Sequence, residues 1–157
     1  MKALALFFAM SVIALAGCTS KPAVSVVNKQ AALAGQLPHN PLAWKVITSS
    51  VNERNGTMST LYGDDVAVQY ARSNSGGTYP AGSVLALVTW AQRDDPHWFG
   101  ARIPSNAKSV EFVSFTADGA KPIYERYEGP LLSHAASSDA DGSRVNYLVS
   151  QRAAVMP

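Results

Sequence analysis

Cysteine is almost absent from this chain of 157 residues, which contains only Cys18. The residues after Cys18 therefore have no thiol, and they form no disulfide, no cysteine-based metal site and no cysteine nucleophile. A domain without such cross-links must be stable through its own core. The length is that of one domain with a single core.

Charged residues are also scarce, at 15% of the chain, and neither sign dominates, because the formal net charge is only +2. The sequence has no run of clustered lysines and arginines. Electrostatic binding to nucleic acid or to an acidic lipid surface needs such a cluster. We therefore expect no nucleic-acid partner.

A long apolar run is missing as well. The N-terminus, MKALALFFAMSVIALAGCTS, has one basic residue, Lys2, then an uncharged apolar stretch from Ala3 to Ala16, then small residues before Cys18. The apolar stretch is shorter than the about 20 residues that span a membrane as a helix. This order of segments is typical of a secretory signal peptide.

The end of this signal, LAGC, resembles the lipobox of bacterial lipoproteins. The resemblance implies that diacylglycerol is attached to the thiol of Cys18 and that the chain is cut just before it. Thr19 in the following position implies anchoring in the outer membrane, with the protein facing the periplasm. The alternative is an ordinary signal peptide with a chance cysteine. We expect the membrane to be a partner through this lipid.

The domain organisation follows from these signals and from composition. We expect a signal peptide at 1–17, a tether of small and polar residues at 18–36, and one domain at 37–157. A flexible tether of this length reaches roughly 20–25 Å. A short helix around 28–33 is compatible with its sequence.

The rest of the chain alternates between apolar and polar residues in short runs, as antiparallel strands do. Asn55-Gly56 and Asp118-Gly119 are hairpin signals, because these residue types tolerate positive φ. The run SVLALVTWAQ is apolar on both faces, which indicates a central strand. We expect strands at 44–51, 56–63, 83–92, 109–117 and 121–129.

Helical patterns are fewer. Residues 64–73 predict a short helix capped by Asp64 or Asp65, with Val66 and Tyr70 on one face. The segment at 145–155 fits either a strand or a helix. A mainly antiparallel sheet with one or two short helices packed on it is an α+β arrangement, and this is the fold class that we predict.

The sequence contains no recognisable pattern of catalytic or metal-binding residues. The three histidines, His39, His97 and His134, are far apart and lack the short spacing of zinc ligands. No G-x-S-x-G nucleophile motif is present. The paired acids fit a helix start and a turn rather than a catalytic carboxylate pair. We therefore predict no catalytic residue and no metal ligand.

The stretch TWAQRDDPHWFGARIP is the best remaining site candidate. Its candidate pocket residues are Trp90, His97, Trp98 and Arg102. The interpretation that we favour is a structural corner, in which Trp98 and Phe99 fill the end of the sheet and His97 is the one candidate functional residue. Adjacent residues of an extended segment point to opposite sides, so we expect at least one of these two rings to be buried.

Three segments together resemble the cytochrome P-460-like family of small, mostly β periplasmic domains related to cytochrome c′-β. They are GTMSTLYGDDVAVQYAR, YPAGSVLALVTWAQRDDPHWFGARIP and SVEFVSF, and the similarity covers roughly 44–127. Classical members attach a c-type haem through a Cys-x-x-Cys-His motif near the C-terminus, and they oxidise hydroxylamine or bind nitric oxide. The resemblance implies the same fold here.

This chain departs from the family where the haem is attached. Thioether attachment needs two thiols, and the C-terminal region has none, so covalent c-type haem is excluded. His134 is a candidate relic of the axial ligand. The family's haem-crosslinking lysine cannot be assigned to Lys45, Lys108 or Lys121.

Two functions follow from this departure. The first is a non-catalytic binding or accessory module without a cofactor, whose ligand is a small molecule or a protein. The alternative is an oxidoreductase that holds haem non-covalently, with His97 or His134 as the axial ligand.

Overall fold

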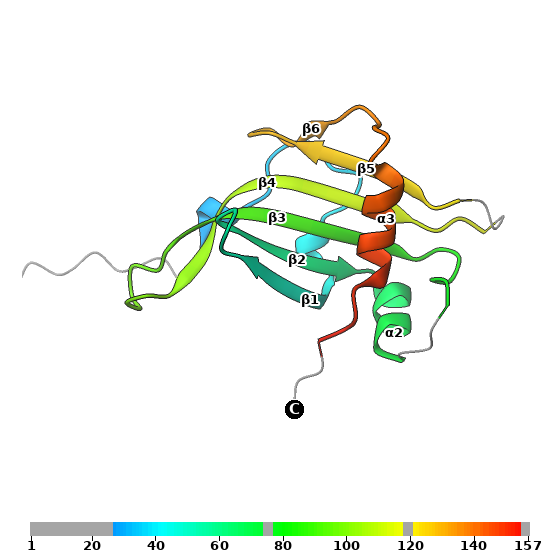
Figure 1. The fold of residues 1–157 in the computed structure, drawn as a ribbon, viewed down its shortest axis with the longest axis horizontal. Helices are drawn as coiled ribbons and strands as arrows, with labels where there is room; N and C mark the ends of the chain where they lie inside the picture. Colours follow the sequence, from blue (N-terminus) through cyan, green and yellow to red (C-terminus); the bar gives the residue numbers. More distant parts are fainter. Residues whose placement is uncertain (1–26, 74–76, 118–120, 155–157) are drawn as a thin grey trace, which may run out of the picture.

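The protein is built on one antiparallel sheet of six strands in the order β1-β2-β3-β4-β5-β6 (Figure 1). The computed structural model describes residues 27–73, 77–117 and 121–154. The strands are β1 (Lys45–Asn52), β2 (Thr57–Gly63), β3 (Val84–Asp94), β4 (Arg102–Ser114), β5 (Ile123–Glu128) and β6 (Ser133–His134). The helices are α2 (Asp65–Ser73) and α3 (Asp141–Ser150), with 3-10 turns η2 (Lys29–Ala31) and η3 (Pro41–Ala43). The predicted α+β class is confirmed.

The first hairpin forms where the sequence predicts it. Gly56 has φ 59° in the β1–β2 turn, and the Asn55 N–H donates to Oδ1 of Asn52 at 3.0 Å. β1 and β2 then pair from Asn52–Thr57 to Lys45–Gly63. The second predicted turn, Asp118-Gly119, lies outside the described residues.

The central strand β3 is buried on both faces, as its composition predicts. Leu85 and Leu87 are at most 5% exposed on one face. Ala86, Val88 and Trp90 are at most 4% exposed on the other. The sheet therefore carries a separate apolar core on each side.

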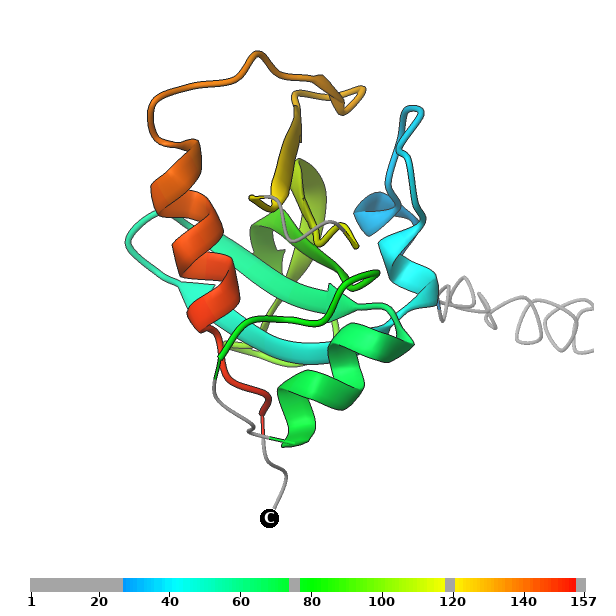
Figure 2. The same cartoon turned by 90° about the vertical axis from the view of Figure 1, so that its right-hand side faces the viewer.

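The first face of the sheet is covered by α2 and α3, whose buried residues belong to one core with the strands. Figure 2 shows α3 on that side. Asp64 begins α2, because its Oδ1 accepts the Ala67 N–H at 2.8 Å. The helix buries Ala67 and Val68, whereas Val66 is exposed. The core of this face contains Ile47, Leu61, Ala67, Val68, Tyr79, Leu85, Leu87, Val113, Phe115 and Leu148.

The C-terminal segment is a helix rather than a strand. Val145, Leu148 and Val149 recur at the three- and four-residue spacing of a helix face, and they pack on the first core. Near the helix start, Oδ2 of Asp141 accepts the Ser138 N–H at 3.0 Å, and Oδ1 accepts the Ser138 hydroxyl at 2.8 Å. These hydrogen bonds hold the pKa of Asp141 below its usual value.

The second face is covered by the N-terminal segment and by the loop after β5. Figure 2 shows the N-terminal segment on the side of the sheet opposite to α3. Gly35, at φ 85°, lies so close to the loop that an added Cβ would be 2.0 Å from the Leu131 carbonyl oxygen. The core here contains Ala86, Val88, Trp90, Val110, Phe112, Tyr127 and Leu132.

Residues 27–36, which we assigned to the tether, contact the sheet. The Trp90 Nε1–H donates to the Ala31 carbonyl oxygen at 2.9 Å, and the Asn28 side chain donates to the Pro104 carbonyl oxygen at 2.7 Å. Ala31 and Leu33 pack against the second core. The folded part of the chain therefore begins before Leu37.

Candidate ligand groove

The first face of the sheet changes from apolar to polar along the strands. Leu61 on β2 and Leu87 on β3 are paired and buried. The next pair on the same face, toward the β1–β2 turn, is Ser59 and Thr89. The hydroxyl oxygens of Ser59 and Thr89 lie 2.9 Å apart. The helices cover the apolar half, so the hydroxyl-bearing half is left open.

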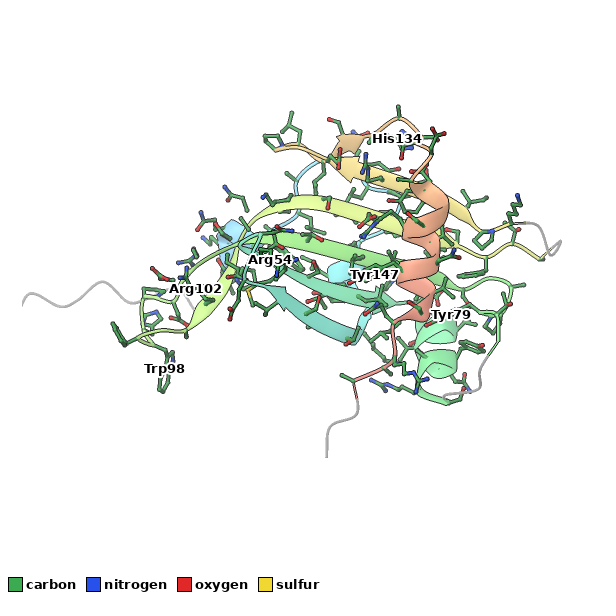
Figure 3. The ribbon with its side chains drawn as sticks, viewed as in Figure 1. Arg54, Tyr79, Trp98, Arg102, His134 and Tyr147 are labelled. Carbon is green, nitrogen blue, oxygen red and sulfur yellow. The ribbon has the colours of Figure 1, made fainter. Side chains whose placement is uncertain are left out.

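A groove of about 790 Å³ lies over this polar half. The β1–β2 turn forms one side of it and α3 contributes to the other. Figure 3 shows Tyr147 on α3 and Arg54 at the hairpin end of the same face. The lining residues are Ser50, Val51, Asn52, Glu53, Arg54, Thr57, Ser59, Leu87, Thr89, Arg144 and Tyr147.

A buried carboxylate lies beside this groove. Glu111 on β4 is 3% exposed, and both of its oxygens are paired with Arg144 of α3. The Arg144 Nε–H donates to Oε1 at 2.8 Å and Nη2–H to Oε2 at 2.6 Å. This two-point contact neutralises the carboxylate and fixes the orientation of the guanidinium.

Two tyrosines extend the pair. The Tyr124 hydroxyl donates to Oε1 of Glu111 at 2.5 Å, and the Arg144 guanidinium carbon lies 4.8 Å from the ring centre of Tyr147. Burial first, and then the hydrogen bond to Glu111, raises the pKa of Tyr124 well above its usual value. The hydrogen bond to Glu111 raises the pKa of Arg144. Tyr124 thus stays protonated and Arg144 stays charged at neutral pH.

Sequence reasoning missed this cluster. The available signal was Glu111 in the middle of the apolar run SVEFVSF, since a carboxylate inside such a strand needs a buried partner. Its partner Arg144 is 33 positions away. The secondary structure of the segment that follows Arg144 was ambiguous, so the sequence did not indicate the pairing.

The structure does not bring the four candidate pocket residues together. Trp90 is 4% exposed in the second core. His97 and Trp98 lie in the exposed turn between β3 and β4, and Arg102 pairs there with Asp94 at 3.0 Å. Figure 3 shows Trp98 and Arg102 at the far end of the molecule from α3.

The expectation that Trp98 or Phe99 is buried is wrong. Trp98 is 73% exposed and Phe99 is 110% exposed. The reason is the length of the hairpin. β2 pairs with β3 only as far as Ala91, whereas β3 and β4 remain paired to Asp94 and Arg102. The turn therefore lies beyond the sheet, where no core is available.

The histidines lie apart from the groove. His39 contacts the rings of Trp44 and Phe112, at centroid distances of 5.3 and 5.8 Å. His134 packs edge-on against Tyr127 at 5.2 Å, and its Nε2 lies 3.9 Å from Oε1 of Glu125. Within residues 27–73, 77–117 and 121–154, no three His, Cys, Asp or Glu side chains gather as a metal site.

The fold and the groove define a small α+β domain with a six-stranded antiparallel sheet and an open polar site beside its C-terminal helix. The family model described as Cytochrome P460 matches residues 38–121, which is more than half of the 157 residues. The chain belongs to the cytochrome P460 family. No curated protein matches it. In the part of the chain that the structure describes, no helix is long and apolar enough to cross a membrane.

The residues around the groove do not fit a haem. Hydroxyl and amide side chains predominate in its lining, whereas a porphyrin needs apolar walls, and no histidine or cysteine is among the lining residues. Two further cavities, of about 540 and 610 Å³ on the second face, are also lined without histidine. The chain's only thiol, Cys18, lies outside the described residues.

Proposed function

We propose that this protein is a non-catalytic binding module whose groove takes a small polar ligand. The observation that supports this is the mutual neutralisation of Glu111 and Arg144, with Tyr124 donating to the same carboxylate. The ionisable groups that meet beside the groove are already paired with one another. The groove itself offers hydroxyls, the Asn52 amide, an aromatic ring and, in the β1–β2 turn, the charged side chains of Glu53 and Arg54.

Such groups bind a ligand without reacting with it. A general acid or base needs a pKa near the working pH and a free position for the proton. Both oxygens of Glu111 already accept hydrogen bonds, and the raised pKa of Tyr124 keeps its proton in place. Neither group is available for proton transfer at neutral pH.

The lining indicates the chemistry of the ligand. The hydroxyls of Ser50, Ser59 and Thr89 donate and accept hydrogen bonds, Tyr147 offers a flat ring, and Arg54 adds an exposed positive charge. These groups suit an oxygen-rich molecule with hydroxyl or carboxylate groups. The open, polar groove is poorly suited to an apolar ligand.

We also propose that the module is a lipoprotein, anchored through Cys18 in the outer membrane and facing the periplasm. The support is the apolar stretch followed by LAGC. Cell fractionation of the wild type and of Cys18→Ser, with mass spectrometry of the N-terminal peptide, tests this. Wild-type protein that is soluble and unacylated would contradict it.

The experiment for binding without haem is an absorption spectrum of protein purified from a haem-replete periplasm. We expect colourless protein that melts cooperatively, because each face of the sheet has its own core. A Soret band at one haem per chain, lost on replacing His97 or His134 with Ala, would instead support a haem-holding oxidoreductase.

Native mass spectrometry of protein released gently from cells then tests the groove. We expect a bound polar small molecule that Thr89→Val loses, because this change removes a lining hydroxyl at nearly constant volume. Thr60→Val is the matched control, since Thr60 lies on the opposite face of the same sheet. Equal retention of the ligand by both variants would place binding elsewhere.

A further inference from the structure

The β3–β4 hairpin extends past the rest of the sheet and ends in two exposed aromatic rings. The Gln92 N–H still donates to the Gly56 carbonyl oxygen of the β1–β2 turn at 2.9 Å. Beyond Gln92 the hairpin is a two-stranded ribbon, paired at Arg93–Ile103 and Asp94–Arg102. Figure 1 shows this ribbon projecting from one end of the molecule. A two-stranded ribbon has no core of its own, so the rings at its tip contribute little to folding.

The tip is nevertheless an ordered turn, held by hydrogen bonds. The Asp95 N–H donates to the Ala101 carbonyl oxygen at 2.9 Å, and the Ala101 N–H donates to the Trp98 carbonyl oxygen at 3.0 Å. Oδ1 of Asp95 accepts the His97 N–H at 2.8 Å. The backbone around Trp98 and Phe99 is therefore held in place, and both side chains point into solvent.

The N-terminal segment joins the domain at the base of this hairpin. The Asn28 side chain donates to the Pro104 carbonyl oxygen at 2.7 Å and accepts from Nη2 of Arg93 at 3.4 Å. Val27 follows Cys18 by nine positions in the sequence. Nine residues span at most about 30 Å even when fully extended, so a lipid on Cys18 would keep this end of the domain near the bilayer.

The same end carries further apolar surface. Ile103 and Pro104 of the hairpin line a groove of about 610 Å³ together with Val27 and Leu42, which are 68% and 44% exposed. Trp is favoured at the membrane–water interface, where its ring lies in apolar and its N–H in polar surroundings. Phe inserts its apolar ring at the same boundary between headgroups and acyl chains. The exposed rings, the apolar groove and the attachment point thus share one end of the molecule.

We propose that Trp98 and Phe99 insert into the lipid interface of the membrane that holds Cys18 and so fix the orientation of the domain. The proposal rests on the anchoring through Cys18. The acids Asp94 and Asp95 and the bases Arg93 and Arg102 balance in formal charge along the hairpin. Insertion is therefore apolar in origin, and it does not require anionic lipid.

The test uses the mature, acylated protein reconstituted in phosphatidylcholine vesicles with either normal or brominated acyl chains, because bromine quenches nearby tryptophan. Trp98 is one of three tryptophans. We expect brominated lipid to remove roughly a third of the wild-type emission and almost none of the emission of Trp98→Phe. Trp44 and Trp90 provide the background signal in that variant. Adding salt should not reduce the quenching.

A second variant, Trp98→Ser with Phe99→Ser, checks the fold and the orientation. It should melt at the wild-type temperature, because both rings are exposed, and it should be cleaved faster by protease at the hairpin on vesicles. If the acylated protein binds vesicles but Trp98 is not quenched, the insertion of Trp98 and Phe99 is wrong and the anchoring through Cys18 stands.

If the protein from cells carries no lipid on Cys18, both the anchoring and the insertion are wrong. Trp98 emission that shifts to the blue with protein concentration, without vesicles, overturns the proposal in favour of self-association.

Discussion

At the scale of single residues, the cluster around Glu111 shows how a sheet accommodates a buried charge. An unpaired carboxylate at this depth is strongly unfavourable. Arg144 supplies the opposite charge and Tyr124 a further hydrogen bond, so both Glu111 oxygens have partners. Because Arg144 remains partly exposed, water reduces the strength of the ion pair, and its role is mainly to satisfy Glu111 and orient α3.

Tyr124 should make the stability of the protein sensitive to alkaline pH. Its pKa is raised in the folded protein from an ordinary value of 10.0. The unfolded chain therefore releases this proton first, and the contribution of Tyr124 to stability, fully present below pH 10, is lost as the pH rises above it. Tyr124→Phe should lower the free energy of unfolding by about 1–2 kcal/mol at pH 7 and should flatten its fall above pH 10.

Urea unfolding at a series of pH values measures this effect. Thr89→Val, which leaves every tyrosine in place, is the control and should show the wild-type decline. If Tyr124→Phe declines as steeply as the wild type above pH 10, the pKa of Tyr124 is not raised in the folded protein.

At the scale of secondary-structure elements, Asp64 joins the start of α2 to the start of β3. One carboxylate oxygen accepts the Ala67 N–H at 2.8 Å, and the other accepts the Val84 N–H at 3.0 Å. The adjacent Asp65 only forms an exposed ion pair with Lys45 at 2.7 Å, which holds the pKa of Asp65 below its usual value. The sequence alone left both acids as candidate caps.

The two acids should therefore respond very differently to replacement. Asp64→Ala should lower the free energy of unfolding by about 1–2 kcal/mol, because α2 loses its cap and the Val84 N–H loses a partner. Asp65→Ala should change it by less than about 0.5 kcal/mol, since exposed ion pairs contribute little. Chemical denaturation of the two variants in parallel measures the difference, and equal losses would contradict the assignment of Asp64 as the cap.

At the scale of the whole molecule, the N-terminal segment completes the second core. It supplies the acceptor for the buried Trp90 N–H and the partly buried side chains of Ala31 and Leu33. Gly35 lets it approach the loop after β5 closely. This segment therefore belongs to the fold and is not only a spacer.

A chain that begins at Leu37 should accordingly be less stable than one that begins at Val27. The shorter chain loses the hydrogen bond of the Trp90 N–H and the cover over the second core, and the hydrogen bond alone contributes about 0.5–1.5 kcal/mol. Thermal melts of the two chains measure this, and the emission of Trp90 should shift to the red in the shorter one as water reaches the ring. Identical melting temperatures would show that residues 27–36 do not stabilise the sheet.

The sequence by itself determined the α+β class, the doubly buried strand β3, the Asn55-Gly56 hairpin, the helix at α2 and the family. These features depend on side-chain alternation and turn chemistry within a few neighbouring residues. The sequence did not predict most of the candidate groove, whose lining comes from β1, β2, β3 and α3. Glu111 was visible only as an unusual residue in an apolar strand.

Only the tertiary structure decided which of the two acids caps α2, that the last segment is a helix, and that Arg144 pairs with Glu111. It also separated Trp90 from Trp98, although both belong to one short stretch. The physical reason is that strand register and the unequal lengths of neighbouring strands set where a side chain finds a partner. β3 and β4 extend past the ends of β2 and β5. Trp90 therefore lies in the second core, whereas Trp98 is exposed to solvent.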